Sequence, residues 1–304
     1  MKLRKPLTLI FRSVLCATMI LGLAACSSDD DAPAADNGDM DMMEMEGDDD
    51  DGDDDAVQET VGEDGISNFV IPLSGEQEAP PVGSETAMGE GNLNIDRAAG
   101  TIEGSVSVSG LTGAATMAHI HQAFAGINGD VLFALTGNED GSLWSVPDGT
   151  VLDAGQLAAL AEGALYINVH TEANPGGEVR GQIIPEGILF EDSELSGDEE
   201  VPPVVSDASG VGVSTVNSES LAISATIFVD GLDDATMAHI HMAPEGENGD
   251  VIIGLEQDPG NPGIWRTPVP SSLTEEQLEA YEDEGLYFNV HSDDFPGGEI
   301  RGQL

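Results

Sequence analysis

The stretch IEGSVSVSG, residues 102–110, alternates apolar side chains with small polar ones and ends at a glycine. This period of two is typical of a β-strand, because successive side chains of a strand point to opposite faces of the sheet. LAISATIFV, residues 221–229, shows a similar alternation, and Gly, Asn and Asp residues bound such runs. The sequence therefore predicts an all-β fold of antiparallel strands, arranged as a two-layer β-sandwich with Greek-key connections.

The second half of the chain repeats the first with a shift of 120 to 121 residues. A repeat of this length predicts two tandem domains, residues 66–185 and 188–304, each large enough to bury its own core. The motifs that recur are TMAHIH (116–121 and 236–241), NGDV (128–131 and 248–251), LYINVH or LYFNVH (165–170 and 286–291), and PGGEVRGQI or PGGEIRGQL (175–183 and 296–304).

One short helix is expected in each domain. Asp153 with Gln156, and Thr274 with Gln277, have the spacing of a capping box, in which the N-cap and N3 side chains bond to each other's backbone amides. The helix would connect two strands.

All six histidines of the chain fall inside the repeated motifs. On a strand, His119 and His121 share one face, and the same parity places His170 with Asn168 and Tyr166. If the two strands are neighbours, three imidazoles converge in each domain. The candidate ligands are His119, His121 and His170 in the first domain and His239, His241 and His291 in the second.

Three neutral imidazoles with an open fourth position suit copper or zinc, one ion per domain. Met117 and Met237 share the face of the paired histidines, and a thioether ligand would favour copper, although an inward-facing methionine more commonly serves packing. The alternative is purely structural: a buried histidine can bond to loop carbonyls or acidic side chains and fasten the domain.

A second cluster follows the tight turns at residues 175–177 and 296–298. Glu178 with Arg180, and Glu299 with Arg301, share a face of the next strand. We expect these residues to support the structure by pairing with each other or with the nearby E-x-P-P segment. The functional alternative is that the arginines recruit an anion to the histidines.

The first 26 residues have the pattern of a secretory signal: basic residues precede an apolar run that is too short to span a bilayer. The run ends in LAAC, which resembles the lipobox of bacterial lipoproteins and predicts lipidation of Cys26. Ser27 follows the cysteine, where aspartate would signal retention at the inner membrane. We therefore expect an exported protein with a lipid anchor in the cell envelope. The sequence favours the outer membrane or the cell surface over the inner membrane.

Residues 27–65 predict a disordered acidic tether, because 15 of the 27 residues from Asp29 to Asp55 are acidic. After loss of the signal, four arginines remain against 58 acidic residues, which gives a formal charge of −54. Such a charge excludes nucleic acid as a partner. With Cys16 removed and Cys26 acylated, no thiol remains for a disulfide or a thiolate site.

The motifs SGEQEAPPV (74–82), AHIH, NGDV and NVHTEANPGGEVRGQI (168–183), with their second copies, resemble the CHRD family. The resemblance implies an extracellular β-sandwich of immunoglobulin-like or superoxide-dismutase-like type, and it implies no established activity for bacterial members. The paired histidines and the later histidine are also similar to the copper ligands of copper/zinc superoxide dismutase. Dismutase activity is not expected, because no histidine remains for a bridging ligand or a separate zinc site.

No serine-nucleophile, phosphate-loop or zinc-protease motif is present. We therefore expect a non-enzymatic binding or structural protein of the envelope, whose partners are the membrane, through the lipid anchor, and an extracellular protein. The alternative is a copper- or zinc-binding protein with one three-histidine site per domain.

Overall fold

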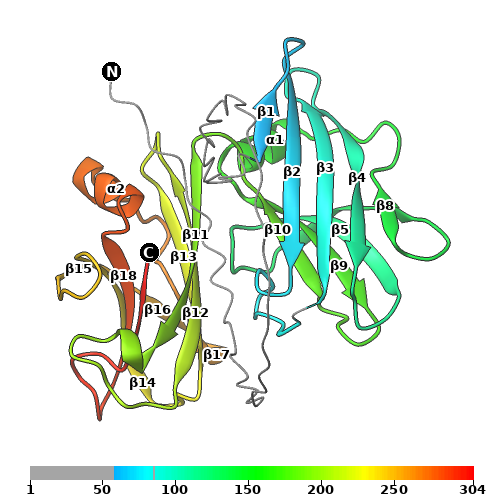
Figure 1. Cartoon of the computed structure of the whole chain (residues 1–304). Helices are drawn as coiled ribbons and strands as arrows, with labels where there is room; N and C mark the ends of the chain where they lie inside the picture. The colour runs from blue at the N-terminus through cyan, green and yellow to red at the C-terminus, as the bar shows by residue number, and fades with distance from the viewer. Residues whose placement is uncertain (1–57, 85) are drawn as a thin grey trace, which may run out of the picture. The chain divides into compact units, whose positions relative to one another are not determined.

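The computed structural model describes residues 58–84 and 86–304, which form two similar modules, each built on one antiparallel sheet (Figure 1). The first module contains β1 (Glu59–Val61), β2 (Ile66–Ser74), β3 (Met88–Asp96), β4 (Thr101–Ser109), β5 (Ala115–Gln122), β6 (Asp130–Ala134), β7 (Thr136–Gly137), β8 (Leu143–Ser145), α1 (Ala154–Ala161), β9 (Leu165–Thr171) and β10 (Val179–Ile183). The second contains β11 (Ile188–Ser196), the 3₁₀-helix η1 (Gly197–Glu199), β12 (Ser209–Asn217), β13 (Ile223–Asp230), β14 (Ala235–Met242), β15 (Asp250–Gly254), β16 (Glu256–Asp258), β17 (Asn261–Arg266), α2 (Glu275–Glu282), β18 (Leu286–Ser292) and β19 (Ile300–Gln303).

The strands follow the same order in both modules. The first sheet runs β6-β5-β9-β10-β2-β3-β4-β8-β7, with β1 added beside β2, and the second runs β15-β14-β18-β19-β11-β12-β13-β17-β16. The all-β fold and the antiparallel pairing are thus as predicted. A sandwich of two separate layers is not confirmed, because the hydrogen-bonded order is continuous and β5 also lies close to β7. Each sheet curls into a nearly closed form around its core.

The core of each module lies on the inner face of the curled sheet. In β5 the side chains of Ala118 and Ile120 are buried, and in β9 those of Ile167 and Val169 join the same cluster. The histidines alternate with these residues and therefore point outward, which confirms the strand parity expected from the sequence. Loops also cover the outer face of β9, since all seven of its residues are buried.

The two helices confirm the capping boxes. The Asp153 carboxylate accepts a hydrogen bond from the Gln156 amide, and the Gln156 side chain accepts one from the Asp153 amide. Thr274 and Gln277 make the same exchange before α2. Each helix leads into the strand that carries the third histidine of its module, β9 or β18. Neither is long and apolar enough to cross a membrane.

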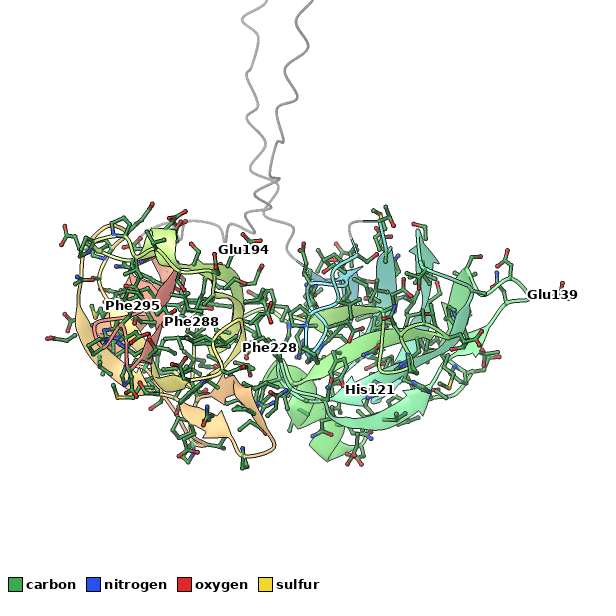
Figure 2. The ribbon with its side chains drawn as sticks, turned by 90° about the horizontal axis from the view of Figure 1, so that it is seen from below. His121, Glu139, Glu194, Phe228, Phe288 and Phe295 are labelled. Carbon is green, nitrogen blue, oxygen red and sulfur yellow. The ribbon has the colours of Figure 1, made fainter. Side chains whose placement is uncertain are left out.

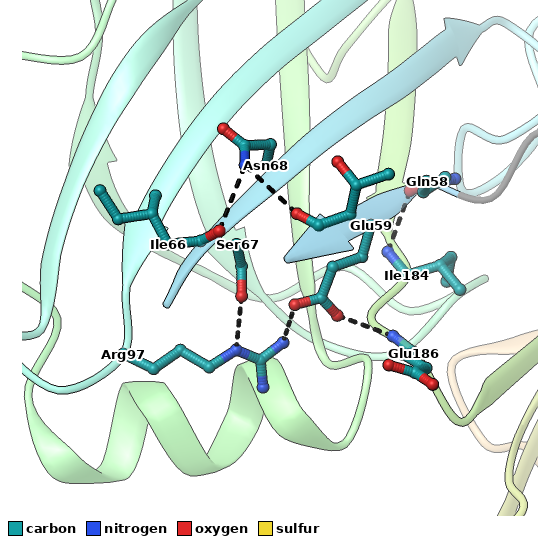
Figure 3. Close-up of polar contacts among 9 residues, drawn as sticks. Gln58, Glu59, Ile66, Ser67, Asn68, Arg97, Ile184 and Glu186 are labelled. Atoms are coloured by element: carbon teal, nitrogen blue, oxygen red, sulfur yellow. Dashed lines mark hydrogen bonds and ion pairs between the residues drawn. The ribbon is translucent and has the colours of Figure 1, made fainter. Parts of the chain in front are cut away.

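The end of the predicted tether is structured. β1 pairs with β2, and the Glu59 carboxylate lies 2.7 Å from Nη2 of Arg97, whose Nε donates to Ser67 (Figure 3). The tether prediction is therefore too long at its C-terminal end, because composition alone did not indicate a three-residue strand held by long-range contacts. The predicted signal, Cys26 and the tether up to residue 57 lie outside the described residues.

Candidate metal centre

The first three histidines converge on the outer face of two neighbouring strands. β5 pairs with β9 so that His119 lies opposite Asn168 and His121 opposite Tyr166. Nδ1 of His119 is 3.0 Å from Nε2 of His170, and the three residues offer ligand atoms that all lie within 4.8 Å of one another. His121 and His170 are buried, whereas His119 is half-buried. Figure 2 labels His121 among the side chains of the first module.

The second module reproduces this arrangement with His239, His241 and His291. Nδ1 of His239 is again 3.0 Å from Nε2 of His291. The ring centroids of the first and third histidines are 4.9 Å apart, against 5.0 Å in the first module, and those of the second and third are 6.2 Å apart in both. The structure therefore brings together both predicted trios.

Two loop carbonyls fix which nitrogen of the buried histidines carries the proton. Nδ1 of His121 lies 3.0 Å from the carbonyl oxygen of Gly129, and Nδ1 of His170 lies 3.1 Å from that of Pro175. A carbonyl oxygen only accepts, so both Nδ1 atoms must donate and both Nε2 atoms keep their lone pairs. Backbone carbonyls hold metal-binding histidines in this same way in many proteins.

Nε2 of His121 and Nε2 of His241 are buried and have no hydrogen-bond partner. A buried acceptor without a partner is destabilising, and such atoms in native proteins frequently mark a bound water or ion. Two nitrogens held at about 2.0–2.1 Å from one tetrahedral ion are about 3.3 Å apart. The 3.0 Å between Nδ1 of His119 and Nε2 of His170 is close to that spacing, and His121, whose ligand atom lies within 4.8 Å of the other two, would need to move closer. These donors therefore fit a transition-metal ion.

The surroundings of the histidines lower their pKa values and so favour the neutral imidazole. Burial disfavours the imidazolium and, together with the nearby His119, lowers the pKa of His170 to about 4. Burial gives His291 the same pKa of about 4 and also lowers the pKa values of His119 and His121. Metal binding requires the neutral imidazole, so no proton has to be displaced from a charged ring near neutral pH.

Tyr166 and the glycine of the NGD motif position His121. The Tyr166 ring stacks on the His121 ring at 4.8 Å, and its hydroxyl accepts a hydrogen bond from the amide of Gly129. The same glycine accepts the His121 proton through its carbonyl. A Cβ atom on Gly129 would overlap the carbonyl oxygen of Gln122, which explains why glycine is needed at this turn. Tyr287 and Gly249 repeat these contacts.

Arg180 contacts the ring of Tyr166 on the outer face of the sheet, on the side away from His121. Its guanidinium lies 3.6 Å above the Tyr166 ring and donates to the carbonyls of Phe124 and Ile127 and to Gln182. The sheet order β5-β9-β10 places His121 and Arg180 on opposite sides of that tyrosine. Because Arg180 is fully buried, it holds a loop in place and is not exposed to attract an anion. Arg301 makes the equivalent contacts over Tyr287.

Glu178 and Glu299 fasten other loops. Glu178 is fully buried and accepts hydrogen bonds from the amide and hydroxyl of Thr112 and from the hydroxyl of Thr171. Glu299 accepts from Ser206 and Ser292. Within the described part of the chain the ion pairs are Arg97–Glu59 and Arg266–Asp258, so the expected pairing of Glu178 with Arg180 is not observed.

The carboxylate that faces Arg180 belongs to the E-x-P-P segment. Glu78 is buried and accepts a hydrogen bond from the Asn168 side chain, which lies opposite His119 on the sheet. Burial raises the pKa of Glu78 to about 7, against the favourable charge of Arg180. The expected link between the arginine and this segment is therefore present as an electrostatic interaction.

Residues 69–183 and 192–304 both match the family model of the CHRD domain. The chain belongs to the CHRD family. No curated protein and no solved structure matches this chain. Each CHRD domain thus carries one complete histidine trio on its outer face, and the family resemblance stated from the motifs is confirmed.

The sequence located the six histidines but missed the groups that orient them. These groups are the carbonyls of Gly129 and Pro175 and the ring of Tyr166. Their signal was present, because NGD, PGGE and LYxNVH recur in both copies. These motifs predict turns and strand parity only. Every residue has a backbone carbonyl, so a contact to a carbonyl cannot be recognised from the residue type.

Proposed function

We propose that this protein is a lipid-anchored envelope protein whose two CHRD domains each bind one copper or zinc ion without catalysing a reaction. The observation that carries the proposal is the buried, unpartnered Nε2 of His121, and of its counterpart His241, in histidine trios whose candidate ligand atoms lie within 4.8 Å of one another. The two other imidazoles of each cluster would complete three nitrogen ligands, and copper and zinc both accept such a set. The bound ion would be stored or would stabilise the domain, and it would take part in no catalysed reaction.

A structural role for the histidines is the competing proposal, and it also has support. His121 and His170 each bond a loop carbonyl, which by itself fastens the loops over the sheet. On this alternative the CHRD domains would act as a metal-free binding or structural module for an extracellular protein. The two proposals differ in whether the Nε2 atoms acquire a metal ligand.

Metal analysis of the purified mature chain separates them. We expect close to two Cu or Zn ions per chain after exposure to the metal and removal of the excess. The double variant His121→Ala/His241→Ala should bind neither ion at these sites, and either single variant should retain one. Gln122→Ala is the matched control, because Gln122 is the exposed neighbour of His121 on β5 and should leave two ions bound.

The outcome that contradicts metal binding is equally clear. If the wild-type chain binds no ion, or if the double variant keeps the wild-type stoichiometry, the trios are not the metal site. Thermal unfolding of each variant in the metal-free state distinguishes loss of ligands from loss of fold.

The envelope location rests on the sequence of the first 26 residues. We propose that Cys26 carries the lipid and that the acidic segment after it separates the CHRD domains from the membrane. Expression of Cys26→Ser should move the protein from the membrane fraction to the soluble exported fraction. Retention of the variant in the membrane fraction would contradict lipidation at this residue.

A further inference from the structure

We propose that the sites select copper over zinc, with Met117 and Met237 as fourth ligands through their thioether sulfur atoms. This inference deepens the proposed function, since it names the metal of the same histidine sites. It assigns a role to Met117 and Met237, which belong neither to the hydrophobic cores nor to the histidine trios.

The register of the sheet places each methionine beside its site. Met117, His119 and His121 are alternate residues of β5, so their side chains leave the sheet on the same outer face. Met117 lies directly opposite His170 on β9. Side chains of directly opposed residues start about 4.5–5.5 Å apart at Cβ, within reach of a long flexible thioether. Met237 and His291 are opposed in the same way.

An irregularity in the strand marks the methionines in both domains. The register of β5 against β9 shifts between Ala115 and Met117, and that of β14 against β18 shifts between Ala235 and Met237. Such bulges are common next to functional sites, where they redirect a side chain.

Packing does not account for these side chains. Met117 and Met237 are each 46% exposed, and neither belongs to the hydrophobic cores. The inward role that methionine commonly has on a strand is therefore excluded. The two copies of the repeat also differ at a core position but not at the methionine. The fully buried Ile167 becomes Phe288 in the second domain, whereas the exposed methionine is retained.

The donor set decides the metal. In the part of the chain that the structure describes, each candidate metal group consists of three histidines and contains no carboxylate. Zinc is satisfied by imidazole with carboxylate, thiolate or water, whereas thioether sulfur is a soft ligand that favours Cu(I). Three imidazoles and one thioether therefore form a set that suits copper better than zinc.

The test compares Cu(I) and Zn²⁺ binding to the full mature chain and to Met117→Leu/Met237→Leu. Leucine keeps an apolar side chain of similar size and has no sulfur ligand. We expect the double variant to lose tenfold or more in Cu(I) affinity, measured by competition with a Cu(I) chelator under anaerobic conditions. Its Zn²⁺ affinity should stay within about twofold of wild type. X-ray absorption of the Cu(I)-loaded protein should show a sulfur neighbour that the double variant lacks.

Two controls isolate the sites. Met88→Leu removes an exposed methionine from β3, which is distant from the histidines in the sheet order, and should leave both affinities unchanged. His121→Ala/His241→Ala measures any Cu(I) bound by the methionines of the N-terminal segment, Met40, Met42, Met43 and Met45.

Three results would overturn the inference. Unchanged Cu(I) affinity in Met117→Leu/Met237→Leu, or equal losses for Cu(I) and Zn²⁺, would remove the methionines from the site while leaving the histidine sites intact. Absence of metal from the wild-type chain would instead defeat the proposed function, and the inference with it.

Discussion

Two tyrosines of the second CHRD domain allow metal binding to be separated from stability. Tyr287→Phe removes the hydroxyl that accepts from the Gly249 amide, and the Gly249 carbonyl in turn holds Nδ1 of His241. Tyr281→Phe removes a hydroxyl that is hydrogen-bonded to Ser214 at 2.8 Å, in the core and away from the histidines. We expect both substitutions to destabilise the domain and only the first to weaken the metal site.

The burial of each abandoned partner sets the size of the effect. A polar group left unpaired costs about 1–3 kcal/mol, and the cost rises with burial. Gly249 is half-buried, so we expect a loss of about 1 kcal/mol from Tyr287→Phe, which corresponds to a fall in Tm of about 4 °C for a domain of this size. Ser214 is fully buried, so Tyr281→Phe should cost about 2–3 kcal/mol.

For metal affinity the order of the two substitutions should be reversed, with the larger loss in Tyr287→Phe. Loss of a group that orients a ligand typically weakens metal binding by about 10–100-fold, and we expect the lower figure for Tyr287→Phe because the stacked ring remains. Titration calorimetry in a His121→Ala background reports the second site alone. Unchanged affinity in Tyr287→Phe, or an equal loss in Tyr281→Phe, would refute the view that Gly249 positions His241 through the tyrosine.

Three further substitutions and one change of pH probe the surrounding structure. Arg97→Gln should lower the free energy of unfolding by about 1 kcal/mol or less in urea titrations, because the ion pair with Glu59 is partly exposed on the arginine side. The metal-free protein should lose stability between pH 7 and pH 5. The pKa of His170 is about 4 in the folded protein and about 6.5 in the unfolded chain, so the unfolded chain binds the extra proton. The raised pKa of Glu78 acts in the opposite direction, so Glu78→Gln should show a steeper loss on acidification in the same titrations. Asp153→Ala removes the capping box of α1 and should cost about 1 kcal/mol by thermal unfolding, whereas a cost near zero would show that tertiary packing holds the helix end.

Local periodicity was sufficient to predict the part of the site that lies on strands. The alternation in AHIH placed His119 and His121 on one face and Ile120 in the core, and the structure has this arrangement. The spacing of Asp153 and Gln156 likewise predicted the start of α1. In each case the controlling interactions join residues only a few positions apart, so the pattern is visible in the sequence.

Long-range contacts were beyond the reach of the same patterns. Glu178 bonds to Thr112, 66 residues away, and Arg180 to the carbonyl of Ile127, 53 residues away. Because Glu178 and Arg180 are two residues apart on one strand, the sequence suggested that they pair with each other. The continuous sheet was missed for a similar reason, since alternation predicts strands but not whether two layers share hydrogen bonds.

The comparison of the two CHRD domains shows which contacts determine the geometry of the site. On the inner face, Ile167 of the first domain is replaced by Phe288, which packs near Gly212 as Ile167 packs near Gly91. On the outer face, the tyrosine, asparagine and histidine of the strand are the same in both copies, and the stacking distance between tyrosine and histidine is 4.8 Å in each. A changed core with unchanged ring spacing means that strand register and outer-face contacts position the imidazoles. Core substitutions that preserve the register should therefore affect stability far more than metal binding.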